Sequence, residues 1–264
     1  MRPAGVLMQR LASSRALFFC RASGRALAAL AALVLVAVTS PNALAGAFAV
    51  NPVRVELSAQ RSSAVLQVEN TGSSEVTVEA RTFAWSQSEG KDQLSPTREV
   101  IITPQVFRLK AGGTQLLRIG ALRKPDPLKE MPYRLVLEEI PPPPAPDIKG
   151  LRVALRISIP VFLRPPVDTK DKIDVVARQE TPQQLRLIFS NTGNASAVFS
   201  KLSVSHTDTP DELLASHGSV IYVLPSQRRE LVLDSKAIDL TKNLLIRART
   251  PTGLVNLDAV FETR

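Results

Sequence analysis

The stretch Leu151-Arg-Val-Ala-Leu-Arg-Ile-Ser-Ile-Pro-Val-Phe-Leu-Arg-Pro165 decides the fold class of this chain. Apolar residues occupy alternate positions from Leu151 to Val161, and this period of two predicts a β-strand with one apolar face. Pro160 cannot donate a ladder hydrogen bond, which indicates an edge strand. Two interpretations follow. The apolar face packs into the chain's own core, or the edge stays open and pairs with another chain by strand addition.

Short strand patterns between turn signals fill the rest of the chain, and no segment has a convincing helical period. In the first half we expect strands at 53–57, 63–69, 75–85, 100–103, 106–109, 115–119 and 133–140. In the second half we expect strands at 173–177, 185–190, 198–204, 220–224, 229–233, 243–249 and 254–261. The pattern predicts an all-β protein.

Arg164-Pro-Pro166 forms a stiff connector between the two halves. The halves also resemble each other, because Val68-Glu-Asn-Thr-Gly72 matches Phe189-Ser-Asn-Thr-Gly193. Two immunoglobulin-like β-sandwich domains, at 46–165 and 166–264, fit this organisation. A single large barrel is the alternative architecture.

Residues 1–45 have the layout of a signal peptide for secretion. Five arginines and no acidic residue precede an unbroken apolar run from Ala26 to Val38. Ala43-Leu-Ala45 then provides a cleavage signal. A retained membrane anchor is the alternative, but the run is short for a span of about 20 residues. Without these arginines the net charge falls from +9 to +4. We expect no nucleic acid partner, because no basic cluster with interleaved aromatic residues is present.

Residues that carry covalent chemistry are scarce. The one cysteine, Cys20, lies in the predicted signal peptide, and His206 and His217 lie in a polar loop region. We find no nucleophile elbow, phosphate loop, dinucleotide-binding glycine pattern or metal motif. We therefore expect a binding protein that is not an enzyme, with no metal, no cofactor and no small-molecule substrate. A hydrolase with an unmarked carboxylate pair stays an alternative.

Several segments together resemble the periplasmic pilus chaperones, the PapD-like proteins of the chaperone–usher pathway. They are residues 51–55, 68–72, 102–113, 133–142, 151–155 and 159–165. The resemblance implies two immunoglobulin-like domains in an L-shaped arrangement. It also implies a periplasmic protein that stabilises pilin subunits by donor-strand complementation through strand 151–161, the G1 strand of the family, and delivers them to an outer-membrane usher. A secreted immunoglobulin-like adhesion or carbohydrate-binding protein is the alternative.

The resemblance also implies roles for single residues. Strand 151–161 would fill the groove of a subunit with four alternating apolar side chains, those of Leu151, Val153, Leu155 and Ile157. Arg54 aligns with an arginine that holds the subunit's terminal carboxylate. Its structural alternative is a solvated arginine on a polar strand face.

The family's second basic residue, a lysine, is replaced by Pro160. Arg156 and Arg118 are candidates for the missing charge. The proline, together with the proline-rich stretch 141–146, resembles the archaic-type branch of the family.

Two further roles concern contacts between domains and between copies. Glu139 and Arg164 match two members of the family's interdomain charge cluster, while the expected aspartate of the second domain is missing near Arg249. The open G1 edge also allows self-association of the free protein.

Overall fold

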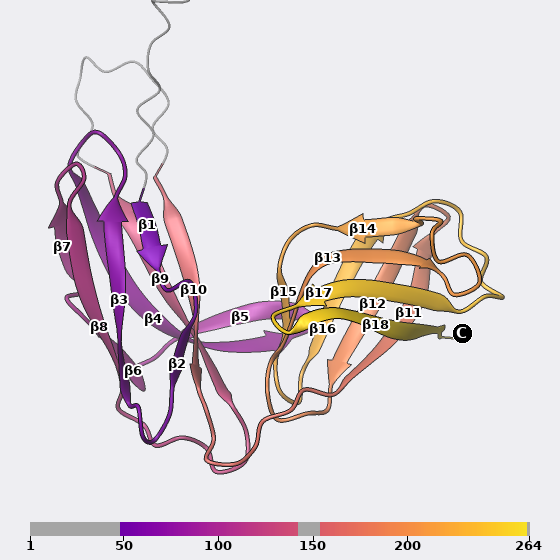
Figure 1. Cartoon of the computed structure of the whole chain (residues 1–264), viewed down its shortest axis with the longest axis horizontal. Helices are drawn as coiled ribbons and strands as arrows, with labels where there is room; N and C mark the ends of the chain where they lie inside the picture. The colour runs from indigo at the N-terminus through magenta and orange to yellow at the C-terminus, as the bar shows by residue number, and fades with distance from the viewer. Residues whose placement is uncertain (1–47, 142–153, 263–264) are drawn as a thin grey trace, which may run out of the picture. The chain divides into compact units, whose positions relative to one another are not determined.

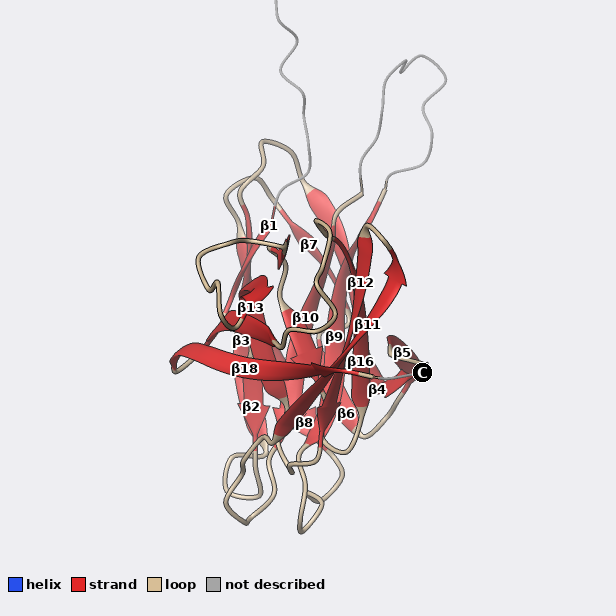
Figure 2. Ribbon diagram, turned by 90° about the vertical axis from the view of Figure 1, so that its right-hand side faces the viewer, coloured by secondary structure: helices blue, strands red, loops and turns tan. Residues whose placement is uncertain are grey.

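A computed structural model describes residues 48–141 and 154–262, which belong to one compact unit comprising residues 45–264. The described residues form strands and loops and contain no helix, as Figure 2 shows. No helix among them could cross a membrane. The predicted signal peptide, Leu151 and Val153 lie outside the described residues.

Two sheets make up the first sandwich within the described residues (Figure 1). One has the order β1-β3-β8-β6, and the other has the order β2-β10-β9-β4-β5 with β7 also paired to β4. The bounds are β1 (Phe48–Asn51), β2 (Val55–Leu57), β3 (Ser63–Asn70), β4 (Val76–Ser88), β5 (Lys91–Pro96), β6 (Val100–Thr103), β7 (Val106–Leu109), β8 (Thr114–Ala121), β9 (Met131–Ile140) and β10 (Arg156–Leu163).

The core of the first sandwich lies between these two sheets. Leu66 and Leu117 face it from β3 and β8, and Leu135 and Val161 face it from β9 and β10; all four are buried. Alternate side chains of a strand point to opposite faces, so the alternating sequence pattern supplies one apolar face per strand. This burial fixes the register of β10 against β9, because a shift by one residue would turn its apolar face outward.

The second sandwich is built from β11 to β18. Its hydrogen-bonded path runs β14-β13-β17-β18-β11-β12-β16, with β15 also paired to β13. The bounds are β11 (Ile173–Thr181), β12 (Gln184–Asn191), β13 (Ala197–His206), β14 (Ala215–His217), β15 (Ile221–Val223), β16 (Arg228–Asp234), β17 (Leu244–Thr250) and β18 (Gly253–Phe261). Phe189 of β12 and Phe199 of β13 are not on neighbouring strands, yet their rings are 5.9 Å apart. The strands of this path therefore form two packed layers with one hydrophobic core between them.

The Asn-Thr-Gly turn recurs in the two sandwiches with the same bonds. Asn70 donates its side-chain amide to the carbonyl of Leu109 (3.0 Å) and accepts a bond from the amide of Gly72 (2.9 Å). Asn191 donates in the same way to the carbonyl of Val223 (2.9 Å) and accepts from the glycine two residues later (2.9 Å). A buried amide needs such partners. The short motif shared by the two halves of the sequence thus corresponds to a shared buried turn.

The all-β fold with two immunoglobulin-like sandwiches is confirmed. One hydrophobic core is built from residues up to Leu163, and the other begins at Val175. Pro165 and Pro166 lie between the two cores. The domain boundary at 165 and 166 agrees with this but stays a prediction.

Candidate functional site

Strand β10 has one covered edge and one edge that is partly open. Along its whole length it pairs antiparallel with β9, from Arg156 opposite Glu138 to Leu163 opposite Met131. On its other side β2 pairs in parallel only with Val161, Phe162 and Leu163. No strand of the described residues pairs with that side between Ala154 and Pro160. We call this segment the free edge.

The direction of the backbone groups explains why Pro160 is tolerated. Leu155 accepts a hydrogen bond from the amide of Glu139 on β9 (2.9 Å), so the residues at odd positions of β10 face β9. In an antiparallel pair these directions alternate, so Arg156, Ser158 and Pro160 turn their backbone groups to the free edge. The missing N–H of Pro160 therefore costs β10 no bond to β9. It also leaves the free edge without a donor at that position.

The side chains of β10 become more buried along the strand. Leu155 and Ile157 are partly buried and pack against the core of the first sandwich, whereas Ile159 and Val161 are buried in it. The first interpretation of the alternating stretch is therefore correct for part of the strand, and pairing with another chain stays a prediction. The second half of the strand is core, and the beginning combines an unpaired backbone edge with half-covered apolar side chains.

The opposite face of β10 carries an aromatic cluster. Phe162 is buried against Trp85 of β4 (ring centroids 6.2 Å apart) and against Tyr222 of β15 (6.1 Å). Leu224 completes this apolar group. Tilted and edge-to-face ring pairs of this kind contribute about 0.5–1.5 kcal/mol each beyond their buried area.

Arg54 lies beside this cluster, immediately before β2. Its Cζ is 4.3 Å from the ring centroid of Phe162, and its Nε donates to Glu56 (3.0 Å). Arg164 donates to the same carboxylate oxygen of Glu56 (2.8 Å). Burial favours the neutral acid, but the bonds and charges of Arg164 and Arg54 outweigh it and lower the pKa of Glu56. The carboxylate of Glu56 therefore accepts hydrogen bonds from both Arg54 and Arg164.

Glu130 is the buried carboxylate that joins the two sandwiches. Its side chain is 3% exposed and accepts a hydrogen bond from the amide of Ser196 (3.0 Å), and its own amide donates to the carbonyl of Asn194 (2.9 Å). Burial raises its pKa, although its bond to Ser196 and the charges of Arg54 and Arg164 oppose the shift.

The two residues assigned to the predicted charge cluster lie far apart along one strand pair. Glu139 and Arg164 lie at opposite ends of the β9–β10 pair, and Glu139 contacts Leu155 through its backbone and its carboxylate. Arg164 pairs instead with Glu56. The acid beside β9 that contacts the second sandwich is Glu130, which precedes β9 rather than standing near its end. Glu139 and Arg164 thus lie apart in the described structure, and their assignment to an interdomain charge cluster stays a prediction.

The two candidates for a second base lie away from Arg54. Arg118 is on β8, in the other sheet of the first sandwich, and its side chain is exposed. Arg156 is exposed at the start of β10, four residues before Pro160, or about 13 Å along a strand. The structure brings neither to Arg54. The arginine that lies directly across from Pro160 is Arg134 on β9, which the sequence pattern did not single out.

Comparison with known proteins agrees with this architecture. Residues 47–167 match a family described as "Pili and flagellar-assembly chaperone, PapD N-terminal domain". The chaperone protein FaeE of Escherichia coli is 38% identical over 89 residues, which is 32% of this chain and 33% of FaeE. The match thus spans a third of that relative's length. The resemblance to PapD-like chaperones read from the sequence is confirmed.

Solved structures share the two-sandwich fold. One is the CsuC–CsuE chaperone–tip adhesion subunit pre-assembly complex from archaic chaperone–usher Csu pili of Acinetobacter baumannii (TM-score 0.62, 22% identity, covering 82% of this chain and 100% of that chain). Another is the SafA pilin in complex with the SafB chaperone of Salmonella enterica (TM-score 0.54, 19% identity, 81% and 96%). Because the sequences are only 22% and 19% identical, the similarity of this chain to these two structures shows the fold alone.

Proposed function

We propose that this chain, whose first sandwich belongs to the PapD N-terminal domain family, is a periplasmic chaperone for pilin subunits. It would bind a subunit by donating β10 as a missing strand, and it would pass the subunit to an outer-membrane usher without covalent chemistry. The free edge of β10 carries this proposal, because a strand with unpaired backbone groups and half-covered apolar side chains fits strand addition.

The energy of such a contact comes from two sources. Each backbone bond that a partner strand makes to the free edge contributes about 0.5–1.5 kcal/mol. Full burial of an aliphatic side chain contributes about 1.5–3 kcal/mol. Leu155 and Ile157 are only partly buried in this chain, so they retain apolar area that a subunit can cover. We propose the same role for Leu151 and Val153, which precede the described part of the strand.

Arg54 is the proposed anchor for the terminal carboxylate of the subunit. It stands one residue before Val55, whose partner on β10 is Val161, so it lies next to the end of the free edge. Guanidinium groups bind carboxylates through charge-assisted hydrogen bonds, which fix the register of the bound strand. Arg54 already shares Glu56 with Arg164, and this contact holds the side chain in place before the subunit arrives.

The alternative, a secreted adhesion or carbohydrate-binding protein, is not favoured. A sugar site needs an exposed aromatic ring on which to stack a pyranose face. The single tryptophan, Trp85, is 3% exposed and packed between Phe162 and Tyr222.

Co-purification from periplasm with candidate pilins tests the proposed function. We expect the wild-type chain to hold a subunit in solution, and Leu155→Arg and Arg54→Ala to fold but lose it. Leu116→Arg is the control for the first variant, because Leu116 is 58% exposed on β8 in the other sheet. Arg108→Ala on β7 is the charge control for the second. Normal binding by folded Leu155→Arg would show that β10 is not the donor strand.

A further inference from the structure

The last part of the β4–β5 hairpin continues past the other strands of its own sheet. Strand β9 pairs with β4 only as far as Ala84, which lies opposite Tyr133. Beyond that point β4 and β5 pair only with each other among the described strands. We call this part, residues 85–94, the arm. A two-stranded hairpin alone is at best marginally stable in water, so the arm depends on other contacts.

The arm makes these contacts with residues 222–230, where the chain turns from β15 into β16; we call them the corner. The side-chain amide of Gln87 donates to the carbonyl of Tyr222 (2.8 Å) and accepts from the amide of Leu224 (3.0 Å). The backbone amide of Gln87 donates to the side chain of Gln227. In a parallel ladder a strand residue bonds its neighbour strand with its own N–H and C=O. Because β15 pairs only with β13 among the described strands, the Gln87 side chain takes the place of a strand residue at its open edge.

The tip of the arm is bonded to β16 by one hydrogen bond and one ion pair. The amide of Glu230 donates to the carbonyl of Gly90 (3.1 Å). Asp92 pairs with Arg229 (3.3 Å), but both side chains are partly exposed, and an ion pair of this kind contributes little. The hydrogen bonds of Gln87 and of Gly90 are therefore the main polar link between the arm and the corner.

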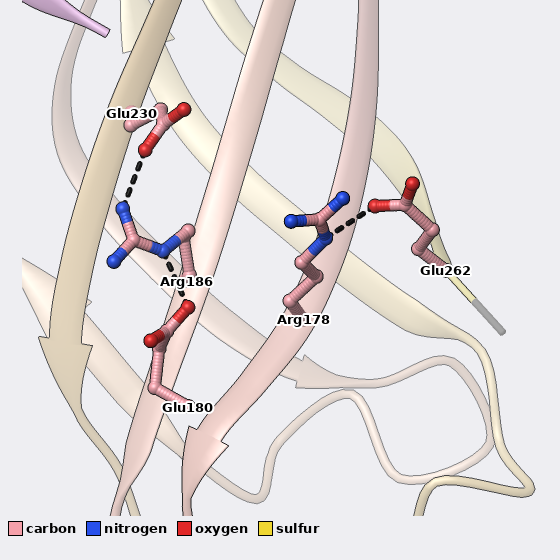
Figure 3. A network of polar contacts seen from close by, with 5 residues as sticks. All are labelled: Arg178, Glu180, Arg186, Glu230 and Glu262. Atoms are coloured by element: carbon pink, nitrogen blue, oxygen red, sulfur yellow. Dashed lines mark hydrogen bonds and ion pairs between the residues drawn. The ribbon is translucent and has the colours of Figure 1, made fainter. Parts of the chain in front are cut away.

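On the second sandwich Glu230 is held in place by a network of charges. Figure 3 shows Arg186 between Glu180 and Glu230, and Arg178 beside Glu262. Arg178 and Arg186 lie directly opposite each other on β11 and β12, where like charges repel. Hydrogen bonds to the glutamates offset this repulsion and raise the pKa of both arginines. The corner is thus fixed to its own sandwich, and the arm is the part that can move.

The contact between the arm and the corner also contains unfavourable elements. Glu89 lies in the turn of the arm and Ser226 in the turn of the corner, with φ values of 52° and 58°. They are two of the three non-glycine residues with positive φ in the described part of the chain. This conformation is strained for such residues and persists only where surrounding contacts hold it. In addition, the Nε1 of Trp85 and the Nε of Arg229 are buried without a hydrogen-bond partner among the described residues, which costs free energy.

A second contact between the sandwiches does not involve the arm. Glu130 accepts a hydrogen bond from the amide of Ser196 (3.0 Å) and donates its own amide to Asn194 (2.9 Å). A hollow of about 170 Å³ is lined by residues of both regions, among them Ala84, Glu130 and Gln227. Because this space separates the two regions, the arm can leave the corner while the bonds of Glu130 remain.

We propose that the arm and the corner form a strap that opens and closes in the free protein, and that the side-chain amide of Gln87 holds it closed. The bonds of Gln87 and Gly90 favour the closed state. The strain in the two turns and the unpartnered buried donors favour the open state. Opening would leave Glu130 as the pivot about which the second sandwich turns.

The strap also has a connection to β10. Tyr222 of the corner packs against Phe162 of that strand, with ring centroids 6.1 Å apart. Opening would therefore remove part of the cover from the strand that we propose to bind a subunit. The inference itself goes beyond the proposed function, because the strap acts in the protein without any partner.

Hydrogen exchange of single amides, followed by NMR on the mature chain, tests the strap. The amides of Leu224 and Glu230 donate to the arm, whereas Leu187 is buried on β12 in the interior of its sheet. Amides that a local opening exposes exchange faster than amides that need global unfolding. In the wild-type chain we expect Leu224 and Glu230 to exchange at least about tenfold faster than Leu187. Equal exchange of the three amides would show that the arm is a fixed part of the fold and would overturn the strap.

Variants of Gln87 test its role in closing the strap. Gln87→Ala should accelerate exchange at Glu230 about tenfold, the value of one hydrogen bond, although Gln87 makes no bond to Glu230 itself. Gln87→Glu has nearly the same shape but cannot donate to Tyr222, so it should have the same effect. Gln93→Ala is the matched control, because Gln93 is exposed on the arm and its side chain makes no hydrogen bond within the described residues. Circular dichroism and thermal unfolding check that each variant is folded. Wild-type exchange at Glu230 in both Gln87 variants would overturn the assignment of Gln87.

Spin labels report the orientation of the two sandwiches directly. Gln67→Cys and Asp258→Cys place labels at exposed positions of β3 and β18, and the sequence has no cysteine after Cys20. Double electron–electron resonance should give a broader distance distribution when Gln87→Ala is added, and an unchanged one when Gln93→Ala is added. The same distribution in all three proteins would overturn the strap. Neither measurement uses a subunit, so the strap can fail while the chaperone function stands.

Discussion

Glu130 is a single residue whose protonation should leave a signature in stability. The folded state raises its pKa above the ordinary value of 4.5, so the folded protein holds this proton more tightly than the unfolded chain does. Between 4.5 and the raised pKa the unfolded chain binds fewer protons, and the free energy of unfolding falls as pH increases. Glu130→Gln keeps an oxygen that can accept the bond from Ser196. It should be at least as stable as wild type at neutral pH.

Urea unfolding from pH 4 to pH 7 measures this difference. The wild-type stability minus that of Glu130→Gln should decrease as pH rises through the window above 4.5. Glu56, whose pKa is lowered, works in the opposite direction in both proteins and cancels in the difference. Glu69→Gln, at an exposed position of β3, controls for the loss of one charge. Parallel curves for wild type and Glu130→Gln would contradict the prediction.

Single residues were predicted from the sequence only where a local pattern or the family resemblance pointed to them. Arg54 was found in this way, and the structure places it at the end of the free edge. Glu139 was named because it matches a member of the family's charge cluster, whereas Glu130 gave no signal, since a sequence contains no measure of which acid is buried. Arg134 gave no signal, since an arginine at an alternating position normally indicates a solvated strand face. Its contact with Trp85 depends on strand pairing.

At the level of one element, β10 should tolerate proline on one edge and not on the other. The amide of Ser158 faces the free edge, so Ser158→Pro should keep wild-type stability while weakening subunit capture and any self-association of the free protein. The amide of Ile157 faces β9, so Ile157→Pro should lower the free energy of unfolding by about 1–3 kcal/mol through the lost ladder bond. Urea unfolding and size-exclusion chromatography distinguish these outcomes. Equal destabilisation by the two prolines would show that both edges are paired.

Most strands were predicted because alternating apolar residues produce them, and the exceptions have a physical cause. Strand β5 (Lys91–Pro96) is exposed along its whole length, so it has no apolar face that a period of two could reveal. Its position follows from pairing with the last part of β4. Strand β1 (Phe48–Asn51) was missed because it is short and directly follows the predicted signal peptide. The short β14 (Ala215–His217) was missed in the second half because its sequence, Ala-Ser-His, has no alternating apolar residues.

At the scale of the whole molecule, the tip of the β4–β5 hairpin links the first sandwich to β16 of the second. The carbonyl of Gly90 accepts a hydrogen bond from the amide of Glu230 (3.1 Å). Gly90 has a φ of +71°, and a Cβ built there would lie 2.6 Å from the Cβ of Glu230. Gly112 has a φ of +69° and no neighbour within 4 Å of such a Cβ. The two glycines thus differ in their surroundings and not in their backbone strain.

Gly112→Ala should therefore lower the free energy of unfolding by about 1–2 kcal/mol, the cost of the left-handed conformation. Gly90→Ala should cost more, because the new methyl group collides with Glu230. Urea unfolding of the two variants measures the difference. In the Glu230→Gly background, which removes that Cβ, the excess cost of Gly90→Ala should be smaller if the collision is its cause. Equal costs for the two glycine substitutions would mean that the hairpin tip is not held against β16.

The shortness of the free edge matters when the chain is alone at high concentration. An uninterrupted, flat apolar edge is a template on which copies add without limit and precipitate. Here β2 covers the edge from Val161 onward, Pro160 removes a donor at its end, and the exposed Arg156 places a charge near its beginning. Charges and prolines of this kind act as gatekeepers against aggregation. The same few residues that define where a partner strand can bind should therefore also keep the unoccupied protein soluble.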